Sequence, residues 1–201
     1  DDSSALTING TAYNDLIAGQ EFSNSAALTI SSGAGLDVID ISNHTSADTV
    51  NAGAGDDIVH VGSDFASETS LDGGSGTDWL IVLASSTNVT YTLNSGVTQN
   101  FENVRTAYGG DVVTGDTGAN ILEGWGGADT LTGGEGDDEL YGYVKHNPQG
   151  VSDGIDKLYG GAGADILKGG AGDDLLDGGT GRDVLSGEGG SDDGTGSISD
   201  T

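Results

Sequence analysis

The second half of the sequence is organised by a strict nine-residue period. Acidic or amide residues recur at every ninth position, and in most units glycines stand just before them and Leu or Val two residues after. These periodic positions are Asp111, Asn120, Asp129, Asp138, Asn147, Asp156, Asp165, Asp174, Asp183 and Asp192. Nine residues provide one short strand and one turn, which bury almost nothing alone. Successive units must therefore coil and stack on one another.

The unit is clearest in residues 160–168 and in the two units that start at Gly169 and Gly178. Each reads G-G-x-G-x-D-x-U-x, where U is a large apolar residue. Glycine permits the positive φ angles and close approaches of a tight turn, and x-U-x alternates as a β-strand does. We interpret the sixth position as a ligand and the eighth as core. The eighth positions are Val113, Leu122, Leu131, Leu140, Leu158, Leu167, Leu176 and Leu185.

The charge of the chain indicates that folding needs a cation. There are 33 Asp and Glu against 5 Lys and Arg, a net charge of -28 in 201 residues, and only 34% of residues are apolar. Such a composition is typical of disordered chains. Bound divalent cations would reverse this, because binding to a site that the unfolded chain lacks adds to the folding free energy. The charge also argues against nucleic acid as a partner, and the absence of cysteine excludes disulfides and thiolate sites.

These units resemble the RTX (repeats in toxin) calcium-binding nonapeptide. The resemblance implies an all-β fold, a parallel β-roll or β-solenoid with two nonapeptides per coil and with several calcium ions in the turns. It also implies that each ion lies between turns stacked on the same face. There the sixth-position Asp of both turns and carbonyls of loop positions one to four would hold it. Calcium suits such donors, because it takes about six to eight oxygens. The strongest pairs are Asp156 with Asp174, Asp174 with Asp192, and Asp165 with Asp183.

The resemblance therefore implies a defined set of metal-site residues. The sixth-position acids of the second half are Asp111, Asp129, Asp138, Asp156, Asp165, Asp174, Asp183 and Asp192. The turn glycines are Gly133, Gly134, Gly136, Gly160, Gly161, Gly163, Gly169, Gly170, Gly172, Gly178, Gly179 and Gly181. Looser units in the first half add Asp37, Asp57 and Asp78, for which a turn-forming role on a solvated face is an equal alternative. Asn120 lacks the charge of an acid, which should weaken its site.

We expect one continuous solenoid with two halves. Residues 1–105 form a degenerate, wider-coiled half, in which 81–105 almost lack acids and should be filled by side chains. Residues 106–194 form the regular half, and 195–201 are a tail. Residues 143–153, which include the only proline, interrupt the pattern without changing its phase. They are either a degenerate unit or an insert of one nonapeptide length, and we favour the insert.

The leading functional hypothesis is a calcium-binding structural module of a large secreted or cell-surface bacterial protein, of adhesin or surface-layer type. It would fold on calcium binding after type I export. The alternatives are an accessory C-terminal domain of a secreted RTX enzyme (protease, lipase or epimerase) and a carbohydrate-binding module. The expected partners are calcium, neighbouring domains of the same polypeptide and, for the last alternative, a surface glycan.

Other classes of function find little support in the sequence. Neither a G-x-S-x-G elbow nor an HExxH helix occurs, so we do not expect the chain to be an enzyme. No run approaches the roughly 20 apolar residues of a membrane-spanning helix. Regular rows of outward threonine are not evident, which argues against an ice-binding face.

Overall fold

The computed structural model describes residues 6–18, 26–62, 65–83, 87–143 and 154–187. In this part of the chain the regular elements are short strands and one 3-10 turn, η2 at Phe65–Ser67. The strands pair in parallel with strands of the next coil, so the expected all-β solenoid is confirmed. No helix among these residues has the length and apolar character needed to cross a membrane.

The chain divides into two compact units. The first comprises Asp1–Leu83 and Asn94–Val104, and the second comprises Ala84–Leu93 and Arg105–Thr201. The strand β11 (Asn103–Arg105) includes the boundary between them. That the units form one continuous solenoid stays a prediction.

In the first unit the strands alternate between two parallel sheets. One sheet contains, in spatial order, β1 (Leu6–Asn9), β3 (Leu28–Ser31), β5 (Thr49–Asn51), β7 (Ser70–Asp72) and β10 (Thr98–Gln99). The other contains β2 (Leu16–Ala18), β4 (Val38–Asp40), β6 (Ile58–Val61) and β8 (Trp79–Val82). Each coil therefore has two edges, where the chain turns from one sheet to the other.

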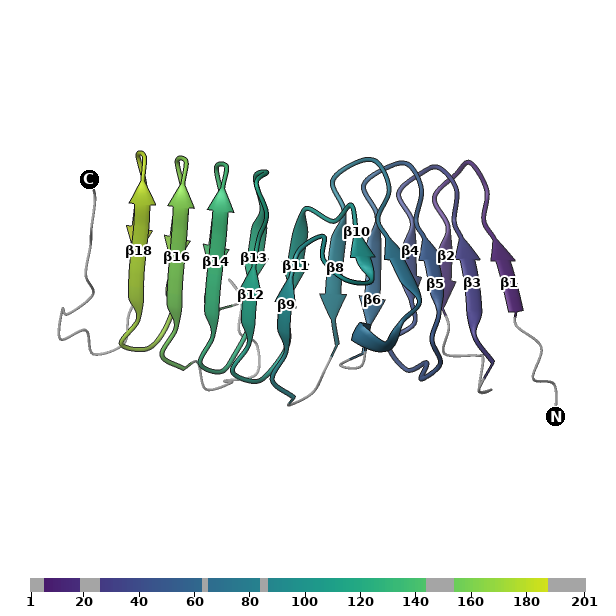
Figure 1. The fold of residues 1–201 in the computed structure, drawn as a ribbon, viewed down its shortest axis with the longest axis horizontal. Helices are drawn as coiled ribbons and strands as arrows, with labels where there is room; N and C mark the ends of the chain where they lie inside the picture. The colour runs from purple at the N-terminus through teal and green to yellow at the C-terminus, as the bar shows by residue number, and fades with distance from the viewer. Residues whose placement is uncertain (1–5, 19–25, 63–64, 84–86, 144–153, 188–201) are drawn as a thin grey trace. The chain divides into compact units, whose positions relative to one another are not determined.

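The second unit repeats this arrangement with shorter coils. One sheet contains β9 (Thr90–Thr92), β12 (Val112–Thr114), β14 (Thr130–Glu135), β16 (Lys157–Ala162) and β18 (Leu175–Thr180). The other contains β13 (Ile121–Glu123), β15 (Glu139–Tyr141), β17 (Ile166–Lys168) and β19 (Val184–Ser186). Figure 1 shows β14, β16 and β18 side by side as successive coils.

Seven of the eight eighth-position residues are buried in the core of the second unit, as predicted, whereas Leu185 in β19 is half-buried. Leu131 pairs with Leu158 and Leu158 with Leu176 across adjacent strands. The fully buried members are Leu122, Leu131, Leu140, Leu158 and Leu167. Burying one such side chain stabilises a protein by about 1.5–3 kcal/mol, so one leucine per strand supplies the apolar part of the folding energy. Larger buried side chains, including Tyr91 and Phe101, fill the stretch at 87–105, in which Glu102 is the one acidic residue.

The outward face of β1, β3, β5 and β7 carries a row of hydroxyl side chains. Thr7 pairs with Thr29, Thr29 with Thr49, and Thr49 with Ser70. The expectation that ordered threonine rows are absent is therefore wrong. The row has no constant period in the sequence, because the paired residues lie 20 to 22 positions apart, and only the stacking of the coils aligns them.

The extra nonapeptide length near residues 143–153 lies within one turn. β14 pairs directly with β16. The acids of the turns before these two strands, Asp129 and Asp156, are nevertheless 27 residues apart, whereas Asp111 and Asp129 are 18 apart. A β-carbon on Gly142 would collide with Oδ2 of Asp156, as at other first-position glycines, and one on Gly154 would collide with the carbonyl oxygen of Gly127. Gly142 and Gly154 thus take the first and fourth positions of a single turn, which favours the insert. Residues 144–153 themselves lie outside the described residues.

Deletion of residues 144–152 is expected to leave the calcium response nearly unchanged. The deletion joins Tyr143 to Asp153 and makes residues 142–159 one nonapeptide of standard length. Closing the shorter loop costs less entropy, so the calcium concentration at half-folding, followed by circular dichroism, should stay within about twofold. A large loss of calcium affinity would show instead that the segment is a coil of the solenoid.

Candidate metal centre

The sixth-position acids connect neighbouring turns through hydrogen bonds. On one edge of the second unit, the N–H of Asp138 donates to Oδ1 of Asp165 at 2.9 Å, and the N–H of Asp165 donates to Oδ1 of Asp183 at 3.1 Å. The buried carboxylate of each turn therefore bridges to the backbone of the preceding turn. Asp165 is shared by two such contacts.

The other edge of this unit has the same ladder. The donor and acceptor residues, in order, are Asp111 to Asp129 (2.8 Å), Asp129 to Asp156 (2.7 Å) and Asp156 to Asp174 (2.9 Å). The structure thus brings together Asp156 with Asp174, as it brings together Asp165 with Asp183. Asp192, the expected partner of Asp174, lies outside the described residues.

First-position glycines leave room for the second carboxylate oxygen, Oδ2. A β-carbon on Gly160 would collide with Oδ2 of Asp165 and with the carbonyl oxygen of Gly178 in the next turn. Gly133 has the matching neighbours, Oδ2 of Asp138 and the carbonyl oxygen of Gly160. A carboxylate oxygen and a carbonyl oxygen from the adjacent turn therefore converge on one point above each of these two glycines. Gly169 and Gly178 have the same contact with the acid of their own turn.

The second and fourth glycines allow the turns to stack closely. Gly161 has φ 115° and Gly163 has φ 145°, angles that side chains with a β-carbon rarely adopt. A β-carbon would also collide with the carbonyl oxygen of Gly134 or Gly136, respectively, in the preceding turn. The remaining predicted glycines at these positions have positive φ as well: Gly134, Gly136, Gly170, Gly172, Gly179 and Gly181.

Several of the Oδ2 atoms are buried and accept no hydrogen bond from the protein. Among the described residues they belong to Asp37, Asp57, Asp78, Asp111, Asp138, Asp165 and Asp183. A buried carboxylate oxygen without a partner carries a desolvation cost. Its recurrence at one position of consecutive turns indicates a bound cation that supplies the missing interaction.

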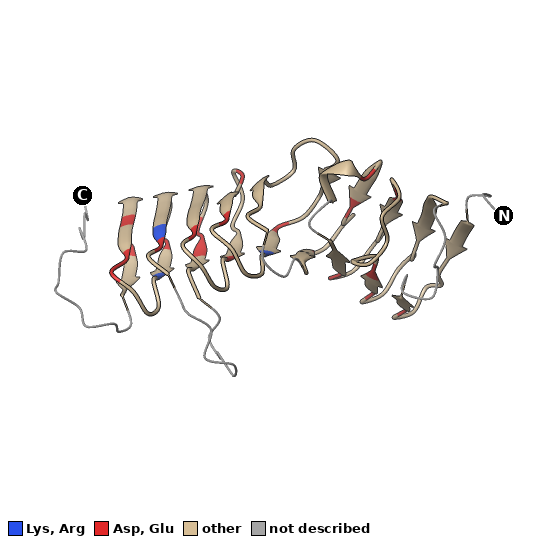
Figure 2. Cartoon of the chain, turned by 90° about the horizontal axis from the view of Figure 1, so that it is seen from below, with Lys and Arg blue, Asp and Glu red and all other residues tan. Residues whose placement is uncertain are grey.

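The electrostatics of the turns agree with this need. Acidic positions recur from coil to coil, and basic ones are few (Figure 2). Burial, with a smaller contribution from neighbouring carboxylates, raises the pKa of Asp138 to about 7 and that of Asp78 to about 6. It also raises the pKa of Asp57 and Asp165. A cation in the turn would oppose these shifts, since a nearby positive charge favours the ionised carboxylate.

Acidification is expected to promote folding in chelator and to oppose calcium binding. In the folded chain without a cation, Asp138 and Asp78 hold protons that the unfolded chain releases near the ordinary pKa of 3.8. Their contribution to stability is therefore fully present below pH 3.8 and is lost as the pH rises through about 6 for Asp78 and 7 for Asp138. In calcium buffer, acidification should instead destabilise the folded chain, because protons compete with calcium for the carboxylates. Circular dichroism from pH 4 to 8, with chelator or calcium, checks both signs, and identical pH profiles in the two buffers would contradict them.

The first unit has a similar ladder on the edge that precedes β4, β6 and β8. The N–H of Asp37 donates to Oδ1 of Asp57 and that of Asp57 to Oδ1 of Asp78, both at 2.7 Å, so the three acids lie in line along this edge. The N–H of Asp78 donates to Oε2 of Glu102 at 2.7 Å. Sequence reasoning missed Glu102, because it lies 24 residues from Asp78 in a stretch without the glycine pattern.

Two sixth-position side chains have partners within their own turn. Oδ2 of Asp15 accepts the N–H of Thr11 at 2.6 Å, and Oδ1 of Asn120 accepts the N–H of Asp116 at 2.9 Å. In both turns the second position is not glycine. The protein itself therefore satisfies these oxygens, which sets the two turns apart from those with unpartnered Oδ2 atoms.

The donor atoms suit calcium better than a transition metal. Among the described residues, no group of three or more His, Cys, Asp or Glu side chains gathers as a metal cluster. The converging atoms are a carboxylate Oδ2 and a backbone carbonyl oxygen of the adjacent turn. Calcium accepts such sets, whereas zinc prefers a tetrahedron of Cys and His.

Comparison with known families supports this assignment. The family model of the RTX calcium-binding nonapeptide repeat matches the chain four times, at residues 45–65, 106–140, 151–185 and 169–197. The matches together span about half of the sequence. No curated protein matches the chain.

Proposed function

Because the chain belongs to the RTX calcium-binding nonapeptide repeat family, we propose that it is the calcium-dependent structural module of a large secreted or cell-surface bacterial protein. The observation that carries the proposal is the series of buried Oδ2 atoms, such as those of Asp138, Asp165 and Asp183, that accept no hydrogen bond from the protein. Calcium binds RTX repeats, and here these acids and the adjacent carbonyls would hold it.

Calcium dependence of this kind suits a protein that folds after export. Extracellular calcium modules have dissociation constants of about 10⁻⁴ to 10⁻³ M, far above the calcium level of a cytosol. The chain would stay unfolded inside the cell, pass a type I exporter in that state, and fold outside. An adhesin or surface-layer protein would use the resulting rigid solenoid as a spacer or platform between neighbouring domains of the same polypeptide.

A metal titration tests this function. Calcium should fold the chain with a midpoint of about 10⁻⁴ to 10⁻³ M, and magnesium at the same concentrations should not, since it demands a tighter octahedral site and keeps its waters. Circular dichroism and size-exclusion chromatography report the transition. A midpoint below about a micromolar would contradict folding after export, because the chain would already be folded in the cytosol.

One surface favours a second candidate function, the binding of a neutral glycan. Beside the hydroxyl row of β1, β3, β5 and β7 runs a second outward row. It consists of Asn9, Ser31, Asn51 and Asp72. Apart from Asp72 these side chains are uncharged, in a chain with a net charge of -28. Short hydroxyl and amide groups both donate and accept hydrogen bonds, which is the chemistry that sugar hydroxyls require.

A charge placed in the hydroxyl row tests the glycan candidate. Thr29→Asp, on the exposed face of β3, should abolish binding to immobilised neutral polysaccharides in calcium buffer. Thr90→Asp, an exposed threonine of β9 in the other unit, is the matched control and should retain it. Equal binding by both variants would exclude this face as the glycan site.

A further inference from the structure

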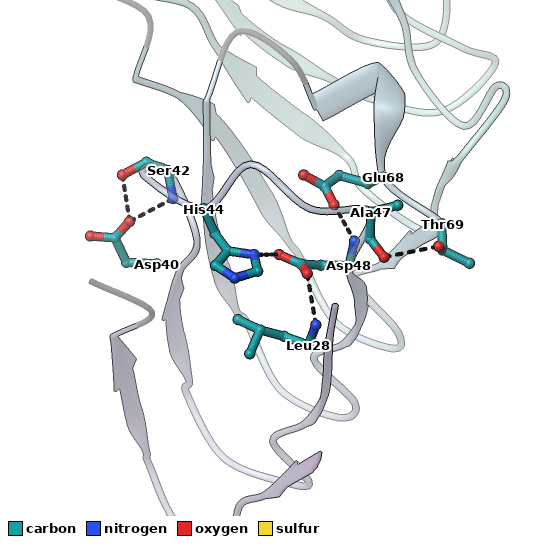
Figure 3. Close-up of polar contacts among 8 residues, drawn as sticks. All are labelled: Leu28, Asp40, Ser42, His44, Ala47, Asp48, Glu68 and Thr69. Carbon is teal, nitrogen blue, oxygen red and sulfur yellow. Dashed lines mark hydrogen bonds and ion pairs between the residues drawn. The ribbon is translucent and has the colours of Figure 1, made fainter. Parts of the chain in front are cut away.

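The turn before β5 contains a buried histidine. His44 is 4% exposed, and its Nδ1 lies 2.6 Å from Oδ2 of the fully buried Asp48. Figure 3 shows the imidazole facing this carboxylate. Asp48 Oδ2 thus has a protein partner, unlike the Oδ2 atoms of Asp37 and Asp57 on the opposite edge of the same unit.

In every other respect Asp48 takes the place of a sixth-position acid. Its Oδ1 accepts the N–H of Leu28 in the preceding coil at 2.8 Å, and its own N–H donates to Oε2 of Glu68 in the next coil. Its carbonyl oxygen accepts the N–H of Thr69 at 2.8 Å. The ladder of this edge therefore runs Leu28, Asp48, Glu68, with Asp48 as its central member.

The turn itself lacks the features of a calcium loop. Residues 43–51 read N-H-T-S-A-D-T-V-N, which keeps D-x-U-x and replaces the three glycines of the consensus. None of residues 43–47 has positive φ, so their carbonyls do not take the arrangement seen at Gly161 and Gly163. His44 stands at the second position, where the consensus has glycine.

A buried carboxylate needs a partner that is charged or donates a hydrogen bond. At turns such as those of Asp138 and Asp165 a cation would meet this need, and at Asp48 the imidazole does. We propose that His44 takes the place of a calcium ion in this turn, so that the edge is closed by a histidine–carboxylate contact and binds no ion there. The inference rests on the proposed function, because it contrasts this turn with calcium-binding ones. Under this proposal the first unit still depends on calcium along its other edge, which carries Asp37, Asp57 and Asp78.

Two variants and a control test the proposal. In His44→Ala Oδ2 of Asp48 loses its histidine partner, and His44→Asn keeps a donor at the position of Nδ1. His60→Ala, which removes the half-buried ninth-position histidine of β6, is the control. The full chain is assayed for calcium ions bound per molecule by equilibrium dialysis, and for thermal midpoint at saturating calcium.

We expect all three variants to bind as many ions as the unaltered chain. The thermal midpoint should fall by at least about 5 °C in His44→Ala, fall less in His44→Asn, and change least in His60→Ala. Loss of one ion in His44→Asn, or an unchanged midpoint in His44→Ala, would overturn the proposal. If the unaltered chain bound no calcium, the proposed function would fail, whereas the thermal measurements would still decide whether His44 braces the turn.

Discussion

Excess chelator is expected to convert the chain from a compact β-solenoid into a largely disordered polymer, and added calcium should reverse the change. The physical reason is charge. Without ions, a net charge of -28 repels itself, and the buried carboxylates of residues such as Asp138 and Asp165 must protonate or return to water. The thin apolar core, with about one or two buried side chains per strand, cannot compensate. Circular dichroism and hydrodynamic radius, measured with and without chelator at pH 7.5, report the transition.

Ionic strength is the control for this experiment. Sodium chloride screens surface repulsion but lacks the charge and coordination to serve the buried Oδ2 atoms. About 150 mM salt alone should therefore not fold the chain. A native β spectrum that persists in chelator would mean that the solenoid is stable without metal and would contradict the proposed function.

Asp165→Ala is expected to be among the most damaging single substitutions. Oδ1 of Asp165 accepts the N–H of Asp138 in the preceding turn, and its Oδ2 lies buried beside Gly160 of its own turn, so its carboxylate serves two adjacent turns. Loss of this carboxylate leaves the buried N–H of Asp138 without an acceptor, which costs about 1–3 kcal/mol. It also removes a charged oxygen from the calcium ligands of both turns. We expect the calcium midpoint to rise at least tenfold, which corresponds to about 1.4 kcal/mol.

Two further variants separate charge from position. Asp165→Asn keeps an acceptor for the N–H of Asp138 and removes the charge, so its midpoint should lie between those of the unaltered chain and Asp165→Ala. Asp173→Ala makes the same change at an exposed fifth position of a neighbouring turn and should shift the midpoint by less than about twofold. Equal midpoints for Asp165→Ala and Asp173→Ala would refute the assigned register.

Several features of this protein follow from its local repeat. A nonapeptide has one apolar position and one acidic position next to three glycines. The burial of Leu131 and Leu158, and the location of Asp165 in a glycine turn, therefore follow from residues that are close in sequence. The sequence also indicates the insert, because the phase of the repeat is the same before and after residues 143–153. Calcium followed from the oxygen donors and from the family resemblance.

Other features depend on which coil lies beside which, and only the tertiary structure decides that. Glu102 joins the ladder of Asp78 from 24 residues away, and Thr7, Thr29 and Thr49 form a row at unequal spacings. In the sequence His44 is indistinguishable from a surface histidine, and only the structure shows that it is buried against Asp48. The physical reason is that a nine-residue unit specifies its own strand and turn through local conformational preferences. The register between coils instead arises from backbone hydrogen bonds and packing between residues 18 to 27 positions apart, which no local pattern encodes where the repeat is irregular.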